Sequence, residues 1–308
     1  MAILRKQFEP IGSLILKGDV MNKCNERTAS DSYPSRQVEV VPPHPSQFIL
    51  PVPTFTKKKA AEEWVNSKFP WLHCTFTGCH LNLLNPIIRQ FVTLSECYPE
   101  VTERMTRILF RQFSVSRMEL SQGQRHIRLA RKYAAEGNRQ MCDRHTRKAH
   151  SILLDYGTRA MTHPGMGTIE FNTRHFKSSF RYFVNLHQEE KSHFHPPTNC
   201  NYGAIMTHEF AHRIFFWLDA CKDIVTVNGQ CENACGIFDI KIASYKLTDE
   251  ISRYASQGHG EMFAEAFVSY YHCTEPVPVA VEIVEFTHKL IDAVRGTHQG
   301  IRFKETKG

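Results

Sequence analysis

The most extended apolar pattern in the chain surrounds a short polar centre between residues 202 and 218. Apolar residues dominate Tyr202–Met206 before that centre and Ile214–Leu218 after it. A run of this length and composition is typical of a helix that is buried on most of its faces. The sequence therefore predicts a buried helix over this segment.

Apolar residues at helical spacing predict three earlier helices. One begins near Thr56, a second carries Pro86 in its first turn, and a third follows Pro99. Their inward residues are Ala61, Trp64 and Val65, then Ile87, Ile88, Phe91 and Val92, then Val101, Met105, Ile108 and Leu109. The stretch 110–115 suits either a strand or a continuation of the third helix.

Short strands are predicted in the middle of the chain. The segments Ile152–Tyr156 and Gly167–Asn172 are compact and apolar, and a turn with Pro164 and Gly165 separates them. A helix over Phe176–Leu186 and a proline-containing loop follow. This order predicts a helix-rich α+β fold with a small mixed sheet, in which a strand lies beside the buried helix.

Proline content divides the chain. Six prolines fall between residues 34 and 53, a density that prevents regular helix and favours extended backbone. The sequence therefore predicts a partly extended arm over 1–55 and one domain over 56–308, a length that suffices for a sizeable core.

Composition indicates a soluble protein. The 42% hydrophobic and 22% charged residues are ordinary for a globular domain. No apolar run approaches the ~20 residues of a membrane helix, and we find no secretory signal. The ten cysteines form no Cys-x-x-Cys pair. Reduced thiols and a cytoplasmic location are therefore expected, with no membrane partner.

Positive charge is concentrated in one segment. Between Val101 and His150 twelve basic residues face four acidic ones, so 12 − 4 = +8 lies here in a chain of net charge +7. Helical spacing predicts a basic helical insertion at about 121–150. Its charge suits either a solvated helix face or, over residues 104–148, the binding of an acidic or nucleic-acid partner.

The polar centre of the buried helix carries candidate metal chemistry. His208 and His212 are four residues apart, so both imidazoles lie on one helix face and can reach one ion. Glu209 beside them completes the His-Glu-x-x-His pattern, in which the glutamate acts on water at a zinc ion. The pattern predicts one catalytic Zn²⁺ and a protein or peptide substrate.

A catalytic zinc usually takes three protein ligands. Downstream of His212, Glu261 and Glu265 share one face of a predicted helix that is otherwise apolar. Spacing alone leaves these two glutamates as nearly equal candidates for the third ligand. The other is then suited to orient a ligand histidine through its second ring nitrogen.

Two motifs resemble a known family. His208–His212, followed by Tyr254-Ala255 and Glu261–Phe267, resembles the catalytic domain of the anthrax lethal factor family and the related metallopeptidase-type domains of phage minor head proteins. The resemblance covers roughly residues 55 to 295 and implies a zincin-like fold in a cytoplasmic or virion-associated protein. It also implies His208, His212 and Glu261 as zinc ligands.

The same resemblance assigns the remaining roles. It implies Glu209 as catalytic base, Tyr254 as transition-state stabiliser, and Glu265 as a residue that contacts the metal ligands without binding the metal itself. Apart from the resemblance, the order of elements along the chain suggests that the strand containing Thr168, Ile169 and Glu170 lines the cleft and aligns an extended peptide, as edge strands do. This chain departs from the family at Gly258-His259, which makes His259 an alternative ligand.

Three functions remain open from the sequence. The first is a zinc endopeptidase of the gluzincin kind. The second is a catalytically idle zincin-fold structural or phage head-associated protein, although no ligand or base is missing. The third is a nucleic-acid-binding protein that uses the basic segment, which would show binding that weakens steeply with salt.

Overall fold

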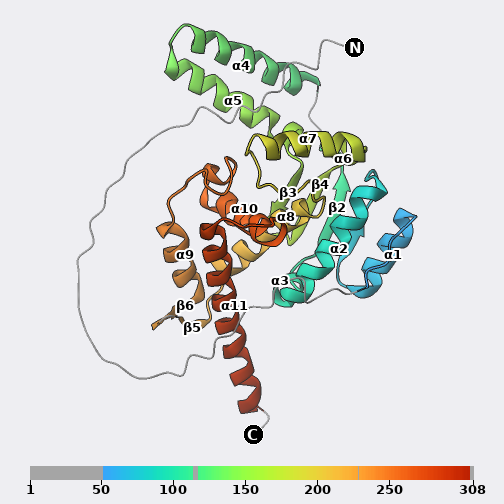
Figure 1. Ribbon diagram of the computed structural model, residues 1–308, viewed down its shortest axis with the longest axis vertical. Coiled ribbons are helices and arrows are strands. Elements are labelled where there is room, and N and C mark those ends of the chain that lie inside the picture. Colours follow the sequence, from blue (N-terminus) through green and yellow to red (C-terminus); the bar gives the residue numbers. More distant parts are fainter. Residues whose placement is uncertain (1–50, 114–116, 228, 306–308) are drawn as a thin grey trace, which may run out of the picture. The chain divides into compact units, whose positions relative to one another are not determined.

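The computed structural model describes residues 51–113, 117–227 and 229–305, all within the compact unit that spans 45–308. The described chain is helix-rich with a small mixed sheet, so the expected α+β class is confirmed at that level (Figure 1). The helices are α1 Lys58–Lys68, α2 Leu81–Cys97, α3 Pro99–Thr102, α4 Arg117–Ala135, α5 Arg139–Gly157, α6 Thr173–Phe176, α7 Ser179–Lys191, α8 Ala204–Asp219, α9 Ala234–Ser244, α10 His259–His272 and α11 Pro278–Glu305, with a short 3-10 turn, η3, at Ala255–Gln257. The strands are β1 His73–Thr75, β2 Arg107–Arg111, β3 Ala160–His163, β4 Thr168–Asn172, β5 Ile224–Val227 and β6 Gln230–Asn233.

The larger sheet has the order β1-β2-β4-β3. β1, β2 and β4 run parallel, and β3 pairs antiparallel with β4. β3 is therefore an edge strand, whereas β4 is hydrogen-bonded on both sides and buried at every residue. β5 and β6 form a separate antiparallel pair.

One continuous apolar core joins the sheet to the helices. Phe210 of α8 lies against Phe91 of α2 and Tyr98, with ring centroids 6.4 and 6.1 Å apart. Tyr98 in turn contacts Phe267 of α10 at 6.3 Å. Because each of these rings is almost completely buried, α8 is held between α2 and α10, which fixes the side chains that α8 presents.

Two predicted elements near residue 100 differ from the structure. α2 begins at Leu81, because the His80 side chain accepts a hydrogen bond from the Asn82 backbone N–H and starts the helix there. Pro86 is therefore inside the helix and not in its first turn. The predicted third helix ends after α3, and β2 follows, with Ile108 and Phe110 buried and the flanking arginines exposed. This alternation is that of a strand.

The basic insertion forms two helices, α4 and α5, which pack along each other. The predicted strand at Ile152–Tyr156 is wrong, because this segment continues α5. Short apolar runs are ambiguous between helix and strand, and here the helix extends through the run. Of the predicted arm, residues 1–50 lie outside the described part of the chain. Among the described helices, none has the length and apolar content needed to cross a bilayer.

The turn between β3 and β4 depends on Gly167. Its φ of +63° is in the left-handed region, and a Cβ at this position would lie 2.4 Å from the carbonyl oxygen of Arg104. We expect Gly167→Ala to lower the free energy of unfolding by about 2–4 kcal/mol, since it combines backbone strain with a clash against main chain. Urea titration followed by circular dichroism measures this change.

Gly165 in the same turn provides the matched control. It has no positive φ, and a Cβ there would meet no atom within 4 Å. Gly165→Ala is therefore expected to change the free energy of unfolding by less than about 1 kcal/mol. Equal destabilisation by both substitutions would contradict the importance of the left-handed conformation at Gly167.

Candidate metal centre

Helix α8 presents two histidines at the centre of the candidate site. His208 and His212 are one turn apart, and their Nε2 atoms lie 3.2 Å from each other. Both rings are largely enclosed by protein, and they meet nearly at right angles, at 81°. The helical spacing predicted from the sequence thus brings the two nitrogens to a common point.

Helix α10 packs against α8 and contributes Glu261. Its Oε2 lies 3.2 Å from Nε2 of His208 and 3.5 Å from Nε2 of His212. This oxygen is buried, yet it makes no hydrogen bond of acceptable geometry. The three side chains form the one group of metal-ligating atoms found among the described residues.

Glu265 lies one turn further along α10 and faces the other side of the His208 ring. Its Oε1 accepts a hydrogen bond from Nδ1 of His208 at 2.8 Å. Its Oε2 accepts from the Ser252 hydroxyl at 2.8 Å and from Nδ1 of His195 at 3.1 Å. When His208 is neutral with its proton on Nδ1, as binding of a metal at Nε2 requires, the Nε2 lone pair points toward Glu261 and His212.

The electrostatics of this group favour a positive charge. Burial alone would raise the pKa of Glu261, but the neighbouring His208 and His212 outweigh burial and lower it well below the usual range. The pKa of Glu265 shifts in the same direction: burial would raise it, but His195 and His208 have the larger effect and lower it to about 2. Burial would lower the pKa of His208, yet the two carboxylates raise it well above normal. Two carboxylates thus stay ionised around the ring nitrogens.

Glu209 is held on the side of α8 that faces the edge strand. The hydroxyl of Thr162, on β3, donates to Glu209 Oε2 at 2.7 Å and to the Glu209 main-chain oxygen at 3.0 Å. Glu209 is buried, and Thr162 fixes its carboxylate. One side chain of β3 therefore connects the strand to the candidate base.

Tyr254 lies directly before η3 and stands beside the histidines. Its ring centroid is 5.8 Å from that of His208 and 5.2 Å from that of His195. Burial raises the pKa of the Tyr254 phenol, and the charges of Glu261, Glu209 and Glu265 raise it further. The phenol therefore keeps its proton and remains a hydrogen-bond donor at neutral pH.

His259, the alternative ligand, and the loop histidines His193 and His195 lie outside the ligand group. His259 begins α10, and its Nε2 is 3.2 Å from the carbonyl oxygen of Tyr245, so it does not act as an alternative ligand in this structure. His193 is hydrogen-bonded to the carbonyl oxygen of Asp249. His195 contacts the site through the Glu265 carboxylate and the ring of Tyr254.

The expected substrate strand at Thr168, Ile169 and Glu170 is wrong. These residues belong to β4, whose backbone is paired with both β2 and β3 and has no edge left for a peptide. Ile169 is in the core, and Glu170 accepts from Arg111 Nε at 2.8 Å. Burial would raise the pKa of Glu170, but Arg111 and His163 lower it, so Glu170 is an internal ion-pair partner.

Sequence reasoning missed Thr162 and Ser252. Thr162 lies on a strand of only four residues, too short to show a period, and Ser252 lies in an irregular segment. Ser252 also accepts a hydrogen bond from the Ala255 N–H at 3.0 Å, which anchors the turn after Tyr254. The one feature of the sequence that indicated Ser252 was its position two residues before Tyr254.

Comparison with known proteins gives no match: no protein-family model, no curated protein and no solved structure is detectably similar to this chain. The chemistry is therefore assigned from the side chains themselves. These side chains place two imidazole nitrogens and a carboxylate oxygen at one point, with the Glu209 carboxylate and the protonated phenol of Tyr254 close by.

Proposed function

We propose that this protein is a zinc-dependent endopeptidase with a zincin-like active site. The supporting observation is the spacing of the three ligand atoms, which lie 3.2, 3.2 and 3.5 Å apart. Tetrahedral zinc with bonds of about 2.0–2.1 Å requires ligand atoms about 3.3–3.4 Å apart.

The donor set also fits zinc. Two histidines and one glutamate leave a fourth tetrahedral position open, as catalytic zinc sites do. The buried Oε2 of Glu261, which has no hydrogen bond, would gain a partner from a cation. Zinc bound there would supply a Lewis acid that polarises a peptide carbonyl and acidifies water.

Side chains of the protein then carry out the proton transfer and the hydrogen bonding that the reaction needs. Glu209, fixed by Thr162, accepts a proton from the attacking water and passes it to the leaving amine. The phenol of Tyr254 donates a hydrogen bond to the oxygen that gains negative charge. Glu265 keeps His208 in the tautomer and orientation in which its Nε2 is free to bind.

The substrate is assigned to the outer edge of β3. This strand is last in the sheet order and contacts Glu209 through Thr162. An extended peptide that adds to this edge would lie along α8, and its backbone would be held without regard to side chains. The role expected for β4 thus moves to β3, whose outer edge pairs with no other strand of the described chain.

Metal removal tests the proposal. The purified protein is expected to hold one equivalent of zinc and to cleave members of a mixed peptide library, as read by mass spectrometry. Dialysis against a chelator should abolish cleavage, because no other group acidifies the water, and added zinc should restore it. Cleavage that persists in metal-free protein, or a protein that binds no zinc, would overturn the proposal.

A further inference from the structure

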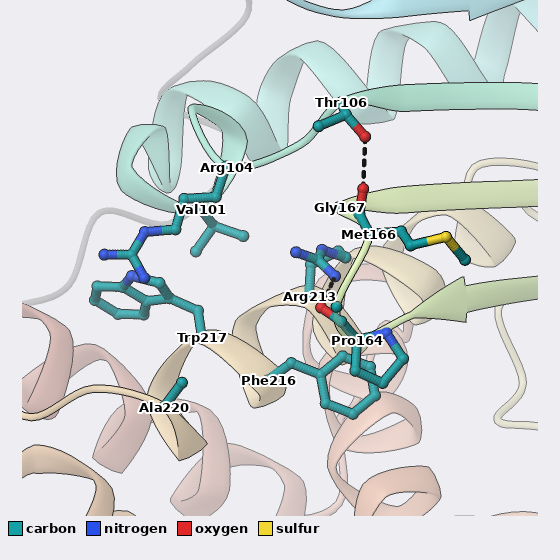
Figure 2. A pocket seen from close by; sticks show the side chains of 11 residues that line it. Val101, Arg104, Thr106, Pro164, Met166, Gly167, Arg213, Phe216, Trp217 and Ala220 are labelled. Atoms are coloured by element: carbon teal, nitrogen blue, oxygen red, sulfur yellow. Dashed lines mark hydrogen bonds between the residues drawn. The ribbon is translucent and has the colours of Figure 1, made fainter.

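A cavity lies beyond the C-terminal end of β3, and no residue of the candidate metal centre lines it. It has a volume of about 270 Å³ and opens between the segment after α3, the β3–β4 turn and the C-terminal half of α8 (Figure 2). Its walls include Arg104 after α3, Pro164 and Gly167 in the β3–β4 turn, and Arg213 and Trp217 on α8.

Positive charge in this cavity has no counter-charge. Arg213 is buried, with a relative exposure of 6%, and its Nη1 donates to the carbonyl oxygens of His163 and Pro164 at 2.8 and 3.1 Å. Its Nε is buried without a hydrogen-bond partner. Arg104 contributes a second guanidinium, and none of the residues lining the cavity is acidic. Within the described part of the chain, neither arginine forms an ion pair.

Burial of the Arg213 guanidinium is costly unless a negative charge or hydrogen-bond acceptors compensate it. A buried charge is normally paired, because leaving water is expensive for an ion. The two carbonyl oxygens satisfy one guanidinium nitrogen and supply partial negative charge, but they leave Nε without a partner.

The remaining walls are apolar and aromatic. Trp217 is almost fully buried, and Phe216, Val101 and Pro164 add hydrocarbon surface. A guanidinium recognises oxyanions through parallel hydrogen bonds, whereas these walls suit a short apolar body. The volume lies just below the range for drug-sized ligands, so a small molecule or a single side chain fits best.

We propose that this cavity binds an organic oxyanion, with a carboxylate or phosphate head at Arg213 and Arg104 and a short apolar body against Trp217. The head supplies a counter-charge to the buried Arg213 and to Arg104, which is exposed, and the body packs against the apolar walls. This site is separate from the metal centre, and the proposal does not depend on zinc or on peptidase activity. Arg213 directly follows the ligand His212 in α8, so the two sites share one helix.

Matched probes test the charge requirement. Phenylacetate, phenyl phosphate and phenylacetamide share an aromatic body and differ in the head group. The two anions are expected to bind saturably, with a change in the fluorescence of Trp217 that is lost in Trp217→Phe. The neutral amide should bind at least about tenfold more weakly, because it forms no charge-assisted hydrogen bonds. The tighter anion identifies the head group as carboxylate or phosphate.

Variants locate the binding. Arg104→Gln is expected to weaken anion binding about three- to tenfold, because one charged donor is lost. Arg213→Lys keeps the charge but loses the fork and should weaken binding as much or more. Arg89→Gln, on the exposed face of α2, is the control and should leave binding unchanged. Equal binding of the amide, no saturable binding, or equal effects of the Arg104 and Arg89 substitutions would overturn the proposal.

Discussion

The Glu209→Gln variant is expected to keep its zinc and to lose peptide cleavage by a factor of about 10²–10⁴. Glutamine has nearly the same shape and can still accept the hydrogen bond that Thr162 donates to the side chain. It cannot accept a proton from water, however, so the step assigned to the carboxylate fails. The three proposed ligand atoms come from other residues, so metal content should not change.

The measurement pairs zinc content with the rate of cleavage of one peptide identified from the library. Glu285→Gln serves as the control, because Glu285 is exposed on α11 and far in sequence from the site. It should match the wild type in both readings. If Glu209→Gln kept both its zinc content and its full activity, another group would have to be the base, and the proposed mechanism would be rejected.

The sequence predicted α8 well because its signal is local. The His-Glu-x-x-His spacing and the flanking apolar residues all lie within one helix, so a period of 3.6 residues carries the information. Long-range pairing carries no such signal. The edge position of β3 depends on the pairing of β4 with β2 on its other side, and those partners, such as Arg107 and Thr168, are 168 − 107 = 61 positions apart.

The choice between Glu261 and Glu265 shows the same limit. Both occupy one face of α10, and their spacing cannot say which oxygen reaches the histidine nitrogens. The packing of α10 on α8 places Glu261 beside both Nε2 atoms and Glu265 beside Nδ1 of His208. A contact between two helices about 50 residues apart in sequence therefore separates two residues that sequence leaves equivalent.

The two glutamates should accordingly fail in different ways when replaced by alanine. Glu261→Ala is expected to reduce zinc affinity by more than the 10–100-fold that loss of an orienting partner causes, since a ligand itself is removed. The Glu261 side chain is 30% exposed, against 1% for Glu265, so the metal-free protein should lose less stability than it does with Glu265→Ala. Zinc content after dialysis and urea unfolding of the metal-free form measure the two effects.

Glu265→Ala is expected to give the opposite balance. Its carboxylate is 1% exposed and accepts hydrogen bonds from His208, Ser252 and His195, so its loss deprives two buried donors and the part-buried His195 of this partner. We expect the metal-free protein to lose about 2–4 kcal/mol of unfolding free energy, and zinc affinity to fall only about 10–100-fold. If instead zinc binding disappeared with Glu265→Ala and survived Glu261→Ala, Glu265 would be the ligand, and the orienting role would belong to Glu261.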